Sequence, residues 1–278
     1  LLDDIILKNK GPFYFIDLHT TSSKTLPFIT INDAIINRKF SQKFPVPIVL
    51  GIEEYLSGPL LSYINTLGYV SLGFESGQHD NKNAISNNIA FINLALEYTN
   101  AVKTRNSIEY YDLLKSSSKS LNEIFQIIYL HRIKDSDNFE NLPSFKSFET
   151  IRKGELIAIH NGKEITAIKK GRIFMPLYQK RGNEGFFIIR KIHPIFLKLS
   201  VFLRHVKADR FFVIMPGISW HSKEKGILKV NLKIAKFYVK SIFHLLGYRS
   251  REVDKTHIFV TNRERVSKTN SYSNESWF

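Results

Sequence analysis

Short apolar runs alternate with segments of helical spacing in the first part of the chain. Three runs are apolar or aromatic and end in polar residues, as buried strands do: FYFIDLHT (13–20), PVPIVLGI (45–52) and YVSLGFE (69–75). Residues 58–68 have helical spacing and end in a glycine, and a longer helix is expected to begin at Asn83 or Ser86 and to run through Tyr98. Strands that alternate with helices predict an α/β architecture around a mixed or mostly parallel sheet.

The pattern changes near residue 125. Short β-like runs separated by Gly and Asn turn signals predict a small β subdomain. After Pro194 a third pattern begins, which ends in a polar tail from Arg263 that is expected to be mobile. We therefore expect a partial α/β domain over 1–124, a β subdomain over 125–193, and a basic, helical C-terminal region with its tail over 194–278.

A lysine-rich amphipathic helix is predicted at 227–246. Four lysines share one face of it at spacings of four, three and four: Lys229, Lys233, Lys236 and Lys240. Val230, Ile234 and Phe237 follow the same period on a neighbouring face, which is expected to pack on the protein. The favoured interpretation is a solvated face on a docked helix. The alternative is attraction of an anionic substrate, a nucleic acid or a membrane surface.

Charge and composition narrow the possible functions. Residues 1–150 carry 14 Lys and Arg against 16 Asp and Glu, whereas residues 151–278 carry 26 against 9, a net charge of +17. The absence of cysteine excludes disulfides, thiolate zinc fingers and cysteine nucleophiles, and it fits a cytoplasmic protein. No apolar run is long enough to span a membrane. The chain begins with Leu1 and its opening resembles the end of a helix, which we interpret as a truncation.

Two stretches carry candidate chemistry. In the stretch that begins at Asp17, the alternation of a strand places Asp17 and His19 on one face, where a carboxylate can orient an imidazole that binds a metal. Glu75 closes an apolar run, and a buried carboxyl group with a raised pKa suits a general acid and base. The plainer interpretations are a hydrogen-bonded structural histidine and an exposed strand end. His79 either lines the same cleft or has a structural role.

The order DLHTTSS, strand, helix, strand, FESGQH resembles the succinylglutamate desuccinylase/aspartoacylase family, over about residues 10–100 and more loosely through 171–188. The resemblance implies a zinc-carboxypeptidase-like α/β core with a small C-terminal β subdomain. It also implies one zinc ion, with His19 as a ligand, Asp17 as the residue that orients it, and Glu75 as the catalytic acid and base. His19 and Glu75 are then expected close together at one edge of the sheet.

The chain departs from the family pattern in several places. The family takes two zinc ligands from a His-x-x-Glu motif near its N-terminus, and nothing before Asp17 supplies one. The only such motif here, His221 to Glu224, lies after Glu75 and is interpreted as accidental. Residues 63–72 lack the family's arginine, and Phe186-Phe187 stand in place of its tyrosine, so N-acetylaspartate is not favoured as a substrate.

The leading hypothesis is a zinc-dependent hydrolase that deacylates a small anionic acylated amino acid, by cleaving an amide or ester bond. The alternative is a non-catalytic binding module that retains the fold. A nucleic-acid binder rests on charge alone and is disfavoured. The oligomeric state is open. The 278-residue chain by itself is expected to bind zinc poorly, to be inactive, and to expose a sheet edge and apolar surface.

Overall fold

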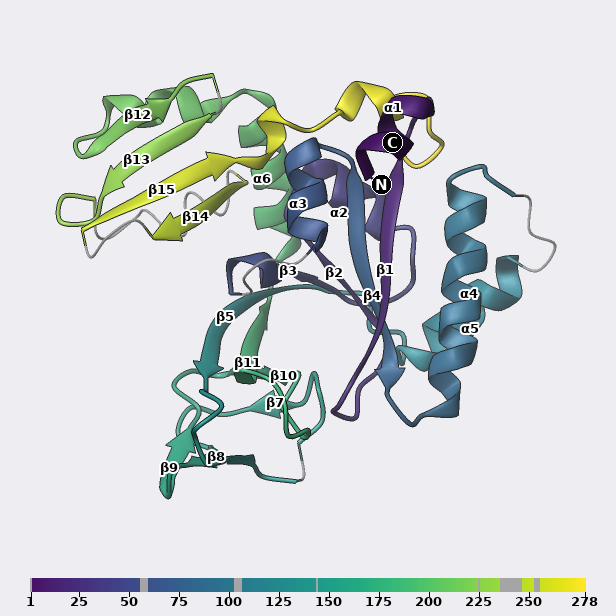
Figure 1. The fold of residues 1–278 in the computed structure, drawn as a ribbon, viewed down its shortest axis with the longest axis vertical. Coiled ribbons are helices and arrows are strands. Elements are labelled where there is room, and N and C mark those ends of the chain that lie inside the picture. Colours follow the sequence, from purple (N-terminus) through teal and green to yellow (C-terminus); the bar gives the residue numbers. More distant parts are fainter. Residues whose placement is uncertain are drawn as a thin grey trace.

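A mixed eight-stranded sheet forms the centre of the protein. The computed structural model describes residues 2–55, 60–102, 107–143, 145–224, 226–235, 247–252 and 256–278. The strands lie in the order β1 (Tyr14–Thr21), β4 (Val70–Gln78), β2 (Phe28–Ile31), β3 (Ile48–Leu50), β5 (Ile124–Arg132), β11 (Glu184–Lys191), β10 (Gly171–Phe174) and β7 (Thr150–Ile151) (Figure 1). The pairs β1·β4, β2·β3 and β3·β5 are parallel, and the other pairs are antiparallel. The prediction of an α/β fold with a mixed sheet is confirmed.

The two helices predicted at 58–68 and from Asn83 or Ser86 through Tyr98 are present among the described helices, which also include others that were not predicted. The described helices are α1 (Leu2–Lys8), α2 (Ile35–Ser41), α3 (Leu60–Leu67), α4 (Lys82–Tyr98), α5 (Ser107–Ser117) and α6 (Pro194–His205), with short 3-10 turns at η1 (Ile52–Glu54), η2 (Ala208–Ile214), η3 (Arg263–Arg265) and η4 (Thr269–Tyr272). The Asn81 side chain caps α4 by accepting a hydrogen bond from the Asn83 amide. Phe91 of α4 stacks on Phe74 of β4 at 3.9 Å, which fixes α4 against the sheet next to its edge strand β1. None of the described helices is long and apolar enough to cross a membrane.

The strands expected over 125–193 are present, and some of them extend the central sheet. β5 joins β3 on one side and β11 on the other. A separate three-stranded sheet is formed by β6 (Phe139–Asn141), β8 (Leu156–His160) and β9 (Lys163–Thr166). A cluster that contains Ile151, Ile157 and Phe186 forms the core of this part.

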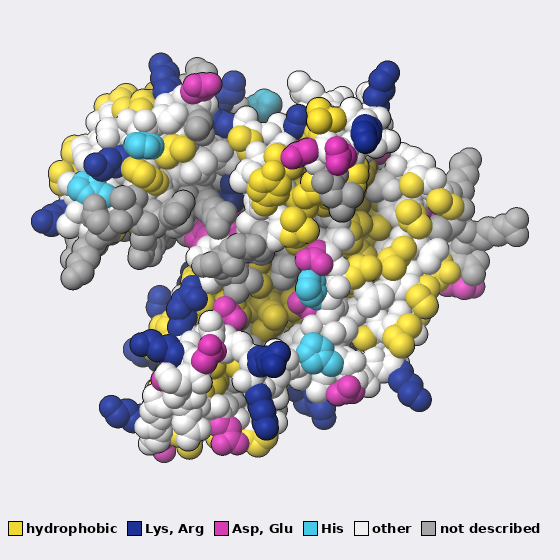
Figure 2. All heavy atoms as spheres, in the orientation of Figure 1, with side chains coloured by type: hydrophobic (Ala, Val, Ile, Leu, Met, Phe, Trp, Pro, Cys, Tyr) yellow, Lys and Arg dark blue, Asp and Glu magenta, His cyan; other side chains and the backbone are white. Residues whose placement is uncertain are grey.

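The C-terminal region contains a third, four-stranded sheet rather than the predicted helix. Its strands are β12 (Ile218–Ser222), β13 (Ile227–Asn231), β15 (His257–Asn262) and β14 (Tyr248–Glu252), in that order. Figure 2 shows the molecule hollowed between this sheet and the part that contains β5. The prediction of a helix at 227–246 is wrong for 227–231, where β13 pairs with β12 and β15. Residues 236–246, including Lys236 and Lys240, lie outside the described residues.

The prediction of a mobile tail from Arg263 is also wrong for Tyr272 and Trp277. Tyr272 and Trp277 are buried in the main core together with Phe40 and Phe44. The Tyr272 hydroxyl donates to the Phe13 carbonyl oxygen and accepts from the Val70 amide. Aromatic burial and these hydrogen bonds outweigh the polar composition of the rest of the segment.

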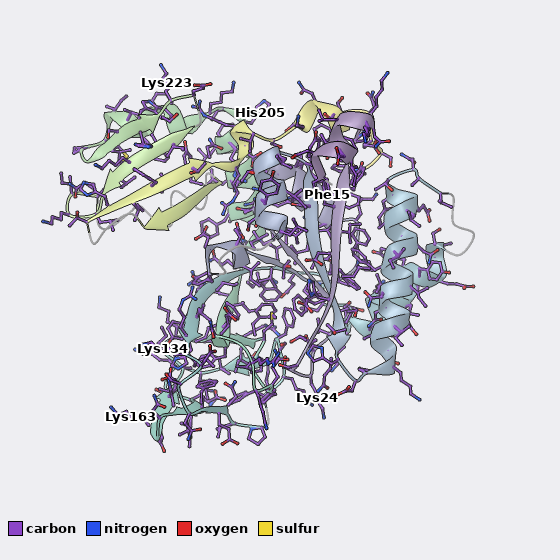
Figure 3. The ribbon with its side chains drawn as sticks, in the orientation of Figure 1. Phe15, Lys24, Lys134, Lys163, His205 and Lys223 are labelled. Carbon is purple, nitrogen blue, oxygen red and sulfur yellow. The ribbon has the colours of Figure 1, made fainter. Side chains whose placement is uncertain are left out.

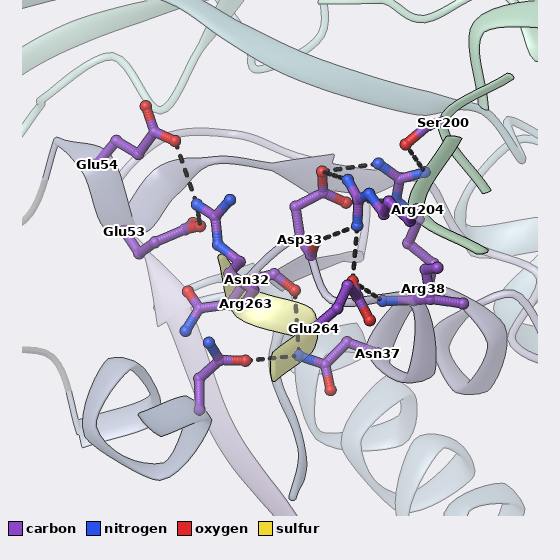
Figure 4. A network of polar contacts seen from close by, with 12 residues as sticks. Asn32, Asp33, Asn37, Arg38, Glu53, Glu54, Ser200, Arg204, Arg263 and Glu264 are labelled. Carbon is purple, nitrogen blue, oxygen red and sulfur yellow. Dashed lines mark hydrogen bonds and ion pairs between the residues drawn. The ribbon is translucent and has the colours of Figure 1, made fainter. Parts of the chain in front are cut away.

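A buried network of ion pairs attaches the C-terminal region to the α/β core (Figure 4). The Asp33 carboxylate accepts from Arg38 of α2 and from Arg204 of α6, the latter at 2.7 Å, and Arg204 also pairs with Glu264 at 2.9 Å. Arg263 pairs with Glu53 and Glu54 of η1. The Arg204 and Arg263 side chains are only 1% and 3% exposed, so these charges are compensated by partners rather than by water.

Candidate functional site

His19 and Glu75 are neighbours on two parallel strands. The register of β1 and β4 pairs Asp17 with Gly73, Leu18 with Phe74 and His19 with Glu75. The register shifts immediately after His19, so regular pairing ends beside this residue. The structure therefore brings together the two candidate residues that lie 56 positions apart in the sequence.

Asp17 contacts the ring of His19. Its Oδ2 lies 2.9 Å from His19 Nε2, as expected for residues two apart on one face of a strand. The side chains of His19 and Asp17 are 55% and 42% exposed, so the pair faces solvent rather than the core. A carboxylate beside Nε2 favours a proton on that nitrogen and leaves Nδ1 with the lone pair that a ligand needs.

Glu75 lies in a more buried environment. β2 flanks it on the side away from β1, with Phe28 as its cross-strand neighbour. Among the described residues, Glu75 Oε2 is buried without a hydrogen-bond partner. Burial raises the pKa of Glu75 to about 7; His19 opposes this shift and Asp17 adds to it. β4 continues to Gln78, so Glu75 lies inside the strand rather than at its end.

Polar residues of α4 hold the strand directly after Glu75. Asn87 Nδ2 donates to the Ser76 carbonyl oxygen at 2.8 Å, and Asn88 Nδ2 donates to Ser76 Oγ at 2.9 Å. Ser76 Oγ in turn donates to the His19 carbonyl oxygen at 3.1 Å. Asn87 and Asn88 were not predicted as residues of the site, because in the sequence they are only polar positions of a helix.

His79 makes hydrogen bonds through both of its ring nitrogens. Its Nδ1 lies 2.8 Å from Thr20 Oγ1, and its Nε2 lies 3.3 Å from Gln179 Oε1 in the loop after β10. Gln179 was not predicted, since only tertiary structure brings it to His79. Both ring nitrogens have protein partners here, which favours the structural interpretation of His79.

The residues near His19 do not form a complete zinc site. Among the described residues, no group of three or more His, Cys, Asp or Glu side chains is arranged to hold a metal ion. His221 lies on β12, in another sheet, and stacks on Phe259. Phe186 and Phe187 are buried in the core and present nothing to a substrate.

Three further histidines have structural contacts. His193 caps α6 by accepting from the Ile195 amide, and His131 and His160 contact each other at 3.0 Å in the β region. None of these three was predicted to bind a metal or a substrate.

Comparison with known proteins supports the fold assignment. No family model matches the chain, and no curated protein matches it. The chain is similar to the crystal structure of a succinylglutamate desuccinylase/aspartoacylase from Rhodobacter sphaeroides, at 15% identity and a TM-score of 0.52, over 69% of this chain and 62% of that one.

Two further structures are more distant. The product-bound ectoine utilization protein EutE (DoeB) from Ruegeria pomeroyi has 14% identity and a TM-score of 0.44, over 64% of this chain and 57% of that one. A succinylglutamate desuccinylase from Vibrio cholerae has 15% identity and a TM-score of 0.41, over 65% and 54%.

The resemblance predicted from the sequence is thus confirmed at the level of the fold, which is that of the succinylglutamate desuccinylase/aspartoacylase structure. The chain spans 62% of the length of that structure. At 15% identity the likeness concerns the fold alone, so activity has to be argued from the site.

Proposed function

We propose that the chain carries the acid–base part of a deacylase site, which cleaves an amide or ester bond in a small acylated amino acid or a similar anion. The observation that carries the proposal is the pairing of Glu75 with His19 across parallel strands, with an unpartnered, buried Glu75 oxygen and a Glu75 pKa of about 7. A carboxyl group with such a pKa exchanges protons readily at neutral pH. The match in fold to a desuccinylase/aspartoacylase supports this reaction class.

Glu75 is the proposed general base and acid. Its carboxylate accepts a proton from water while the water oxygen forms a bond to the acyl carbon. Glu75 then gives that proton to the leaving nitrogen or oxygen as the bond from the acyl carbon breaks. The same group serves both steps because its pKa lies near the working pH.

His19 is proposed as a zinc ligand through Nδ1, with Asp17 holding the ring from Nε2. A catalytic zinc keeps three protein ligands, and the described residues gather no such set around His19. No step of the reaction is therefore assigned to a metal. The net charge of +17 on residues 151–278 favours an anionic substrate.

The test uses the protein as its own cell makes it, purified with its metal and assayed on a panel of N-succinyl and N-acetyl amino acids. Glu75→Gln is expected to lower kcat by about 10²–10⁴-fold while the zinc content stays unchanged. His19→Ala is expected to lower the zinc content itself, and Asp17→Asn to weaken zinc binding by about 10–100-fold.

Glu164→Gln is the control, because Glu164 is an exposed carboxylate on β9. It should leave both turnover and zinc content unchanged. Wild-type turnover by Glu75→Gln would contradict the role of Glu75. Full zinc content in His19→Ala would contradict the role of His19.

A further inference from the structure

Helix α6 has one face on the protein and a second, apolar face toward solvent. Ser200 and Arg204 are buried, and Arg204 is fixed there by Asp33 and Glu264. The opposite face repeats every three or four residues through four exposed side chains: Ile195, Leu199, Phe202 and Val206. The usual orientation of an amphipathic helix is thus reversed in α6, because its apolar face is toward solvent.

The apolar surface continues into the next element. η2 follows α6 and contacts it, and Phe211 and Ile214 are 69% and 79% exposed. Between 195 and 215, nine large apolar side chains are exposed: Ile195, Phe196, Leu199, Val201, Phe202, Val206, Phe211, Ile214 and Met215. A concentration of this kind is unusual on a surface that meets only water, and it marks an interaction site.

Helix α6 and Lys207, which closely follows it, carry no negative charge. The segment 194–207 contains no Asp or Glu, and its exposed ionisable side chains are Lys198, His205 and Lys207. Asp209 and Arg210 follow in η2, one of each sign. Lys198 and His205 come three residues after Ile195 and Phe202, so they border the apolar stripe. Figure 3 shows His205 at the end of α6, on the same side of the molecule as the four-stranded sheet.

We propose that α6 and η2 form a docking surface for an anionic membrane. The apolar side chains would enter the boundary between headgroups and acyl chains, and Lys198 and Lys207 would meet the anionic headgroups. A second copy of the chain fits less well, since it would bring the lysines of two α6 helices together, and α6 contributes no carboxylate. The inference does not depend on the proposed hydrolase activity.

The outer face of α4 provides the contrast. Ile85, Ile89, Ile92 and Leu96 also form an exposed apolar stripe, and Figure 2 shows hydrophobic side chains along that side of the molecule. The charged residues of α4 are Lys82 and Glu97, one of each sign. This face therefore offers apolar area without a cationic border, and it is the internal control for the test.

The experiment measures co-sedimentation with phosphatidylcholine vesicles, with and without a fraction of phosphatidylserine, at low and physiological salt. The protein is expected to bind the serine-containing vesicles, to bind less at higher salt, and to bind phosphatidylcholine alone weakly. Phe202→Ser is expected to weaken binding by about tenfold or more, and Lys207→Gln by about fivefold. Ile85→Ser on α4 is expected to change nothing.

Several outcomes would overturn the proposal. They are absence of binding to the serine-containing vesicles, equal binding to both vesicle types, or full binding by both Phe202→Ser and Lys207→Gln. A lipid-free oligomer that Phe202→Ser dissociates would identify a second copy as the occupant instead. Selective binding to an acidic protein with no vesicle binding would also overturn it. Lys207→Gln decides the matter if Phe202→Ser fails to fold.

Discussion

Glu75 shows how its immediate surroundings can prepare a single carboxyl group for proton transfer. Burial opposes its ionised form, the His19 imidazole supports that form, and Asp17 opposes it. Burial is the strongest influence, so the pKa rises to about 7 although a histidine lies on the next strand. The same arrangement costs stability whenever Glu75 is ionised, which is a feature that functional sites retain.

This cost predicts how stability depends on pH. An unfolded glutamate titrates near about 4.3, so between that pH and about 7 the folded chain holds a proton that the unfolded chain has released. Stability from this group therefore falls as pH rises through that window. Glu75→Gln should remove this loss of stability with rising pH. In urea unfolding, the variant's free energy of unfolding relative to wild type should therefore be higher at about pH 8 than at about pH 5. Glu164→Gln should follow wild type, and identical pH dependence in Glu75→Gln would contradict the prediction.

At the residue scale, local periodicity predicts pairs but not their surroundings. The two-residue period of a strand was sufficient to place Asp17 beside His19. The proximity of His19 to Glu75 could be predicted only with the order of the strands, and that order came from the family resemblance. Asn87 and Gln179 were missed because a side-chain amide has no distinctive spacing, and its partners are chosen by the fold.

At the scale of elements, a chain of polar contacts links β5 to β8. Tyr129 OH lies 3.2 Å from His131 Nδ1, His131 Nε2 lies 3.0 Å from His160 Nδ1, and His160 Nε2 lies 3.1 Å from Asp137 Oδ2. The Asp137 carboxylate favours a proton on His160 Nε2, so each neutral imidazole donates toward Asp137 and accepts on its other side. The His131 ring stacks on Phe186 and on Phe139.

Because of His131, the protein should become less stable as the pH falls into the acid range. Burial and the neighbouring His160 lower the pKa of His131, although Asp137 opposes the shift. Below its unfolded pKa of about 6.5 the unfolded chain binds more protons, so stability falls as pH falls. His131→Phe keeps the stacking and should lose less stability between about pH 7 and pH 5 in urea unfolding, while losing about 1 kcal/mol at pH 7. His221→Phe, on β12, is the control, and an unchanged acid response in His131→Phe would refute the assignment.

The prediction of a helix at 227–246 is wrong for its first residues because two periodicities coexist there. Lys229 and Lys233 fit a helical face, but Leu228 and Val230 also fit the alternation of a strand. In the structure Leu228 and Val230 are buried and Lys229 is exposed, with β12 and β15 on either side. Pairing with strands distant in sequence decided between the two, and single-sequence periodicity contains no information about those partners.

At the scale of the whole molecule, the C-terminal region supports the strands that carry the site. Ion pairs of Arg204 and Arg263 fix α6 and η3 to the loop at Asp33 and to η1. Arg204 and Arg38 hold the pKa of Asp33 well below its usual range against the effect of burial, so this attachment persists to acidic pH. The segment after η3 then returns to β1 and β4, where Trp277 Nε1 donates to Tyr14 OH at 3.1 Å.

Tyr272 makes this connection between the C-terminal segment and the strands of the site most directly. Its hydroxyl donates to the Phe13 carbonyl oxygen, just before β1, and accepts from the Val70 amide at the start of β4. These are the strands of His19 and Glu75, so one hydroxyl joins their N-terminal ends. Tyr272→Phe keeps the buried ring but leaves both backbone groups without this partner, which should lower the free energy of unfolding by about 1–3 kcal/mol. Tyr63→Phe, at an exposed position on α3, should change the free energy of unfolding by less than about 0.5 kcal/mol in the same urea titration.

Hydrogen exchange at the Val70 amide should also accelerate in Tyr272→Phe, because the hydrogen bond to the Tyr272 hydroxyl protects this amide. Unchanged exchange together with unchanged stability would show that the tail packs on these strands without holding them.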